Sequence, residues 1–189
     1  MNTTQTPNDL VKHCIDRAFY AHGTSRIFER RAQSLGKKRN AITFLGIAVP
    51  LTVGSLILSF GTMPTLLPVL VWIAGAIGTV QLILSMWSIV VRWDEQYSYA
   101  ITAMQANTRL YNTWERLSKN QPPNLKELVS ETDAEDQRQE QSDLTQHISE
   151  SEKRFAMRAS LFYKGSICVT CKTKPVSMKP SNCDTCGNF

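Results

Sequence analysis

Two apolar stretches decide the fold of this chain: AITFLGIAVPLTVGSLILSF at residues 41–60 and LLPVLVWIAGAIGTVQLILSMWSIVV at residues 66–91. Both lie within residues 40–91, a run of 52 residues without a charge. Twenty helical residues extend about 30 Å, the thickness of a bilayer's hydrocarbon core. The segment GTMP (61–64) between them has the Gly and Pro of a turn. The sequence therefore predicts a transmembrane helical hairpin. A buried hairpin in a soluble protein is the alternative, which the length of the uncharged run disfavours.

The flanking charges predict the orientation of the two spans. Lys37, Lys38 and Arg39 precede the first span, Arg92 follows the second, and the connecting loop has no charge. Because Lys and Arg concentrate on the cytoplasmic side, we expect both termini in the cytoplasm of a multi-pass membrane protein. Residues 1–39 carry eight Lys and Arg against three Asp and Glu, which favours an anionic membrane surface over nucleic acid as the partner.

Small and polar residues recur every three or four positions in each span, so each set occupies one helix face. Such residues allow close helix packing in lipid, or they line a weakly polar pore in a homo-oligomer, and both interpretations stay open. Gln81 favours the pore slightly, because an amide at mid-membrane depth needs a polar partner or water. The candidate pore-lining or packing residues are Thr52, Ser55, Ser59, Gly78, Gln81, Ser85 and Ser88.

Helices are also predicted on both sides of the apolar run. Small and apolar residues spaced three and four apart form one packing seam before it and a second seam after it. The first seam is Val11, Cys14, Ala18, Ala21, Ser25, Phe28, Ala32 and Leu35, and the second is Ala100, Ala103, Asn107, Leu110, Trp114 and Leu117. The two helices can pack antiparallel as a cytoplasmic extension of the hairpin. Gly23 interrupts the first helix as a weak point, costing about 1 kcal/mol relative to Ala.

These patterns predict an all-α membrane protein with a small zinc-ribbon-like tail. The expected segments are a basic cytoplasmic helix (1–39), the transmembrane hairpin (40–91), a cytoplasmic helix (92–120), a linker (121–132), a further cytoplasmic helix (133–163) and a metal-binding tail (164–189). The acidic run ETDAEDQRQEQSD (131–143) is interpreted as a solvated face, since clustered carboxylates favour water.

The tail holds four of the five cysteines as Cys168, Cys171, Cys183 and Cys186, two CxxC pairs separated by eleven residues. This spacing is typical of metal knuckles, and four thiolates close a tetrahedral site with no position left for water. We therefore expect structural zinc as the cofactor. A rubredoxin-like iron site and a thiol–disulfide pair are the alternatives.

No signature of catalysis was found: the chain has no nucleophile elbow, phosphate-binding loop, HExxH or convergent acid pair. Cys14 is interpreted as a core residue, and His13 and His22 as surface residues rather than ligands. Four tail lysines offer few phosphate contacts, so we do not expect nucleic acid as a partner. We expect a protein that is not an enzyme.

The basic first helix, the two closely spaced spans and the cytoplasmic helices resemble the SLATT proteins, bacterial two-span membrane effectors. The tail CVTCKTKPVSMKPSNCDTC (168–186) is similar to a subgroup on mobile elements recognised by CxxC, eleven residues and CxxC. The resemblance implies the bacterial inner membrane and a role in anti-phage conflict. There, such proteins are thought to assemble pores that depolarise the infected cell, triggered by a nucleotide signal or a sensor protein. The resemblance to SLATT proteins implies no catalytic residues.

Two functional hypotheses follow. The leading one is a pore-forming or membrane-perturbing effector in an abortive-infection system. It is based on the polar stripes in the spans and on the helix seams, which are poor in Leu and Ile and would gain further burial from partner subunits. The other is a non-conducting membrane scaffold whose zinc tail recruits a soluble partner.

Overall fold

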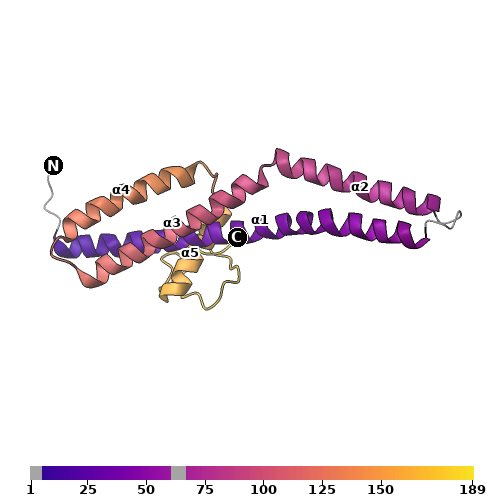
Figure 1. Ribbon diagram of the computed structural model, residues 1–189. Coiled ribbons are helices and arrows are strands. Elements are labelled where there is room, and N and C mark those ends of the chain that lie inside the picture. Colours follow the sequence, from indigo (N-terminus) through magenta and orange to yellow (C-terminus); the bar gives the residue numbers. More distant parts are fainter. Residues whose placement is uncertain (1–5, 61–66) are drawn as a thin grey trace. The chain divides into compact units, whose positions relative to one another are not determined.

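The computed structural model describes residues 6–60 and 67–189. Within these residues the chain is helical, with no strand (Figure 1). The helices are α1 (Pro7–Phe60), α2 (Leu67–Val90), α3 (Trp93–Asn120), α4 (Leu125–Leu144) and α5 (Glu150–Lys164). The all-α fold class is thus confirmed for this part of the chain, while the predicted turn at 61–64 lies outside the described residues.

Helix α1 runs without a break through the expected boundary at residue 39 and through Pro50. The segment from Lys37 to Arg39 contains good helix formers and no Gly or Pro, so nothing local ends the helix there. The basic helix and the first apolar segment are therefore one element.

The described residues form two compact units. Unit 1 contains the chain up to Arg30 together with Ala100–Phe189, and unit 2 contains Arg31–Tyr99. Unit 1 thus holds the first part of α1, most of α3, both later helices and the tail. Unit 2 holds the rest of α1, the whole of α2 and the start of α3.

The core of unit 1 forms along the predicted seams. Cys14, Ala18 and Ala21 of α1 are buried together with Leu110, Trp114 and Leu117 of α3. All six residues predicted for the α3 seam are buried, and in α1 only Val11 and Leu35 are partly exposed. The two helices run antiparallel, because His13 contacts the Trp114 ring while His22 contacts the Tyr111 ring. The seam prediction is confirmed.

Helix α4 corrects two expectations. It begins at Leu125, inside the predicted linker (121–132), because Leu125 and Val129 join the core of unit 1. Its acidic run is also not fully solvated. Asp136 is 7% exposed and Asp143 is 4% exposed. Each of these carboxylates accepts hydrogen bonds from neighbouring helices, which offsets the cost of burial.

A break at residues 145–149 separates α4 from α5, whereas one helix was expected over 133–163. The cause is a capping box. The Ser149 hydroxyl accepts from the backbone N–H of Glu152 (3.2 Å), and the Glu152 carboxylate accepts from the N–H of Ser149 (2.9 Å). This exchange satisfies donors that a helix start leaves free. At the other end, Gly165 adopts φ of 64°, a left-handed conformation that glycine takes easily.

Helix α5 packs closely on α1 at Gly23. A Cβ at that position would lie 3.0 Å from Ser160 Oγ and 3.1 Å from the carbonyl oxygen of Ala156. The Ser160 hydroxyl donates to the carbonyl of Phe19 (2.8 Å). Gly23 was expected to be a weak point of its helix, but its missing side chain makes room for this contact.

Unit 2 exposes its apolar residues. By length and composition, two helices of the described chain could cross a membrane, the one that includes residues 41–59 and α2. No residue within their most apolar windows is buried. At the polar end of unit 2, Lys38 lies over the Trp93 ring (5.5 Å) and Arg39 over the Tyr97 ring (4.8 Å). Arg39 also pairs with Asp94 (3.4 Å).

Candidate metal centre

The four tail cysteines come together at one point. Their sulfur atoms all lie within 4.8 Å of one another. Cys168 and Cys183 Sγ are 4.0 Å apart, and Cys171 and Cys186 Sγ are 3.8 Å apart. A disulfide needs about 2.05 Å, and all four cysteines are free. Thiolates about 2.3 Å from a tetrahedral zinc ion lie about 3.8 Å from each other. These side chains therefore fit a tetrahedral metal ion and not a pair of disulfides.

The two CxxC segments fold as equivalent turns. The N–H of Lys172 donates to the carbonyl of Cys168 (2.9 Å), and the N–H of Gly187 donates to the carbonyl of Cys183 (2.8 Å). Thr170 and Thr185, the third residues of the two turns, share a hydroxyl hydrogen bond of 2.6 Å. The sequence signal for this pairing is the repeated threonine in CVTC and CDTC.

Position 187 requires glycine, because the backbone of Ser181 lies very close to it. A Cβ there would collide with the carbonyl oxygen of Ser181. The tail (165–189) holds its shape by such turns and contains no strand, so the zinc-ribbon-like expectation is wrong in that respect. Metal ligands, rather than a sheet, bring its two ends together.

Hydrogen bonds and burial divide the four thiols electrostatically. The hydroxyl and backbone of Thr173 lower the pKa of Cys171 to about 6. Backbone N–H groups of Cys186 and Thr185 lower the pKa of Cys183. Burial raises the pKa of Cys186 to about 12. A lowered pKa favours the thiolate form that binds a metal. A bound divalent cation would stabilise the thiolate of Cys186, which burial disfavours.

Further residues attach the metal centre to the helical bundle. Cys168, Cys183 and Cys186 share an apolar cluster with Leu161, and Phe19 and Met157 pack against it. Arg158 of α5 donates hydrogen bonds into the tail. No local pattern marks Arg158 in the sequence, because its acceptors lie 19 to 28 residues further along the chain.

Cys14 does not join the metal-ligand group. It is fully buried in the α1–α3 core, and burial raises the pKa of its thiol. His13 hydrogen-bonds Asp133 (2.9 Å) and has a side chain that is 41% exposed. His22 differs from expectation, since its ring is half-buried and stacks on Tyr163 at 4.4 Å between centroids.

The candidate pore-lining or packing residues divide into two groups within unit 2. Gly78, Gln81, Ser85 and Ser88 of α2 are all half-buried, and the Gln81 amide lies beside Gly46 of α1. Thr52, Ser55 and Ser59 of α1 are exposed. Thr52 also borders a cavity of about 200 Å³ that residues of α1 and α2 line together. The two polar stripes therefore have different surroundings in a single chain.

Several cavities in unit 1 offer polar side chains. One of about 480 Å³ is lined by four helices and includes Arg17, Asn107, Asp136 and Asp143. These groups bond one another: Arg17 and the Trp114 indole donate to Asp136 (both 2.8 Å), and Asn107 donates to Asp143 (2.8 Å). They hold helices together.

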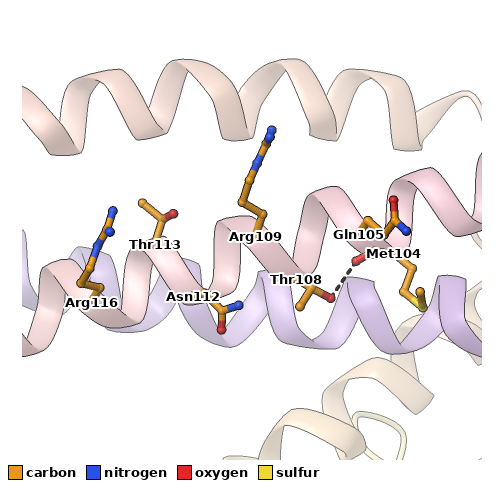
Figure 2. Close-up of a pocket in the computed structure, with 7 residues that line it drawn as sticks. All are labelled: Met104, Gln105, Thr108, Arg109, Asn112, Thr113 and Arg116. Atoms are coloured by element: carbon orange, nitrogen blue, oxygen red, sulfur yellow. Dashed lines mark hydrogen bonds between the residues drawn. The ribbon is translucent and has the colours of Figure 1, made fainter.

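A groove of about 520 Å³ runs along α3 (Figure 2). Arg109 points from this groove toward α4, where it pairs with Glu135. One helix supplies the whole lining, so the groove offers no convergent groups to a ligand. Its lining residues are Met104, Gln105, Thr108, Arg109, Asn112, Thr113 and Arg116.

The fold and the site define a class: an all-helical protein with two long apolar helices and a four-cysteine metal-binding tail. The family model described as "Mobilome CxxCx(11)CxxC protein" matches residues 11–189. The chain belongs to this family, as the spacing of its cysteines predicted. Comparison with curated proteins and with solved structures gives no match.

Proposed function

We propose that this chain is a two-span protein of the bacterial inner membrane that assembles with copies of itself and forms a pore or perturbs the bilayer. The spans would be residues 41–60 and α2, folded as an antiparallel hairpin with both termini in the cytoplasm. Unburied apolar helices and the cations at their ends support this topology. Free cysteines fit a reducing compartment.

The observation that carries the effector proposal is the exposed hydroxyl stripe of α1. Ser55 and Ser59 are exposed among apolar residues such as Leu51 and Leu58, while Thr52, also exposed, borders the cavity between α1 and α2. Thr52 bonds its own helix, donating to the carbonyl of Ala48 (2.7 Å). Serine hydroxyls facing hydrocarbon gain most from a neighbouring subunit or from water. We therefore assign Ser55 and Ser59 to subunit contacts or to a pore lining.

The resemblance to SLATT effectors supports a role in anti-phage abortive infection, with a nucleotide signal or a sensor protein as trigger. The family's mobile-element description is compatible with such conflict systems. The zinc would be structural, and the proposal includes no enzymatic activity.

Membrane insertion is tested first. The full-length chain should sediment with membranes from a detergent-free lysate and resist alkaline extraction. An N-terminal tag should be protected from external protease in spheroplasts. A chain that stays in the supernatant, or a tag that is digested, would contradict the topology.

Pore formation is tested with purified protein in liposomes. We expect dye release that depends steeply on protein density. The double change Ser55→Leu and Ser59→Leu should reduce it at least several-fold, because the stripe loses its hydroxyls. Leu58→Val is the matched control, since Leu58 is highly exposed on the same helix. Intact vesicles at high density, with and without candidate triggers, would sink the proposal.

A membrane-anchored scaffold is the second candidate. It is favoured by the half-buried stripe of α2, which one chain already uses for packing. The tail also exposes Ile167, Val169 and Val176, which a soluble partner could cover. If deleting residues 165–189 abolishes the cellular phenotype while the two serine changes leave it intact, the scaffold replaces the pore.

A further inference from the structure

Arg158 occupies an unusual environment for a cation. It belongs to α5 and is 8% exposed. Its Nε donates to the carbonyl of Ser177 (2.9 Å), and its Nη1 donates to the Ser181 hydroxyl (3.1 Å) and the carbonyl of Cys186 (3.2 Å). All three acceptors are neutral oxygens of the tail. Burying a guanidinium is costly, and neutral acceptors offset only part of that cost.

The other side of α5 is fixed to α1. Ser160, two residues beyond Arg158, points in a nearly opposite direction on the helix. Its hydroxyl donates to the carbonyl of Phe19, and the close contact at Gly23 lies beside it. Helix α5 therefore connects the tail to the bundle, with Arg158 facing the tail.

The charge of the metal centre supplies a reason for a buried arginine. Four thiolates around a divalent cation leave two negative charges in excess. Three of the four cysteines are buried, so water screens this excess poorly. Arg158 bonds the backbone carbonyl of one ligand, Cys186, and so stands next to that charge.

We infer that Arg158 is a positioning residue for the four-cysteine centre, which fixes the second CxxC turn against α5 and compensates the negative charge of the metal–thiolate group. Its guanidinium serves both roles because it is always charged and holds several donors in a fixed plane. Residues that orient metal ligands contribute about 10–100-fold to metal affinity. The inference rests on the metal site and does not depend on the membrane proposal.

The test uses the full-length chain in detergent. Zinc affinity is measured by competition with a chromophoric chelator, and the ligand field is followed in the Co²⁺-substituted protein. Arg158→Met should weaken zinc binding about 10–100-fold and alter the thiolate-to-cobalt charge-transfer bands. Arg158→Lys keeps the charge and loses the planar fork, so it should recover part of the affinity. Arg138→Met, on the exposed face of α4, is the matched control.

Unchanged zinc affinity and cobalt spectrum in Arg158→Met would overturn the inference. If Arg158→Lys and Arg158→Met lose the same zinc affinity, Arg158 does not act by compensating the charge of the metal–thiolate group. If Arg158→Met fails to fold, Ser181→Ala tests the positioning role instead. This change deletes one hydrogen-bond acceptor of Arg158, and we expect it to weaken zinc binding a few-fold. Wild-type affinity in Ser181→Ala would then contradict the positioning role. None of these readouts requires membrane activity, so they distinguish failure here from failure of the pore.

Discussion

At position 23 the lack of a side chain lets α5 approach the backbone of α1. The nearest atoms to a Cβ built there belong to Ser160 and Ala156, at 3.0 to 3.2 Å. Two of these three atoms are a backbone oxygen and a Cβ, which cannot rotate away. Helix propensity alone would favour Ala or Leu at this position by about 1 kcal/mol. Packing therefore outweighs propensity at this residue.

Replacing Gly23 by Leu should destabilise unit 1 by about 1–3 kcal/mol, because the added atoms force α5 away from α1. Thermal unfolding in detergent, followed by circular dichroism, measures this loss. Gly75→Leu is the control, since nothing lies within 4 Å of a Cβ at that residue. A Gly23→Leu protein as stable as the control would show that α5 does not depend on this contact.

His22 should make stability depend on pH. Burial, followed by the nearby charges of Arg26 and Lys164, lowers the pKa of His22 to about 4, although Glu115 opposes this. Between pH 6.5 and about 4 the unfolded chain binds a proton that the folded chain does not. Stability from this residue is therefore fully present above pH 6.5 and falls as the pH drops toward 4.

The change His22→Gln should remove this dependence. Because the His22 ring is only half-buried, we expect its contribution to the free energy of unfolding to change by about 1–2 kcal/mol between pH 6.5 and 4. Melting temperatures of the wild type and His22→Gln, measured from pH 7.5 to 4, provide the check. If the melting temperatures of the two proteins change in parallel with pH, His22 is not the source of the pH dependence.

At the scale of elements, the buried carboxylates of α4 hold that helix to the bundle. Asp136 accepts from Arg17 of α1 and from the Trp114 indole of α3, so one side chain joins three helices. Asp143 accepts from Asn107 of α3 in the same way. An isolated α4 has few apolar residues, and these polar contacts specify where it packs.

Removing the Asp136 carboxylate should cost about 2–4 kcal/mol, because it leaves the Trp114 N–H and the Nε of the partly buried Arg17 without their acceptor. We expect Asp136→Ala to unfold at a lower denaturant concentration, with hydrogen exchange fastest in α4. Glu140→Ala is the control, since Glu140 is exposed and pairs with Arg17 only at 3.4 Å. Equal stability of the two variants would show that α4 does not need the buried carboxylate.

At the scale of the whole molecule, we expect the fold of the tail to depend on a bound metal. Residues 165–189 have turns and few apolar contacts, so metal binding would supply much of the free energy that folds them. The α1–α3 core, in contrast, is built from apolar seams and has no metal ligand. Metal loss should therefore affect the two parts of unit 1 differently.

Chelating the metal should make the tail sensitive to trypsin at Lys172, the tail lysine that no proline follows, while α1, α3 and α4 stay resistant. Proteolysis followed by mass spectrometry checks this, with metal content measured in parallel and about one zinc expected per chain. Readdition of zinc should restore resistance, and Cys14→Ala, which removes the buried thiol without burying a hydroxyl, should keep the wild-type zinc content. A metal-free tail that resists trypsin as before would contradict a metal-dependent fold.

The sequence alone determined those features that depend on local spacing. The uncharged run indicated the two apolar helices, the three–four spacing predicted the seams around Cys14 and Trp114, and the CxxC gaps predicted the metal ligands. Each of these patterns lies within a few residues of the chain, or within one helix face, so composition and period are sufficient to read it.

Contacts between distant segments became apparent from the packing of the helices. Arg17 meets Asp136 across 119 residues, Ser160 meets Phe19 across 141, and Arg158 meets Cys186 across 28. The acidic run looked solvated because local composition cannot show that two of its carboxylates face donors on other helices. Gly23 looked like a defect for the same reason. Burial of a polar group, or the need for a glycine, depends on which surface packs against it, and that is settled only when the helices come together.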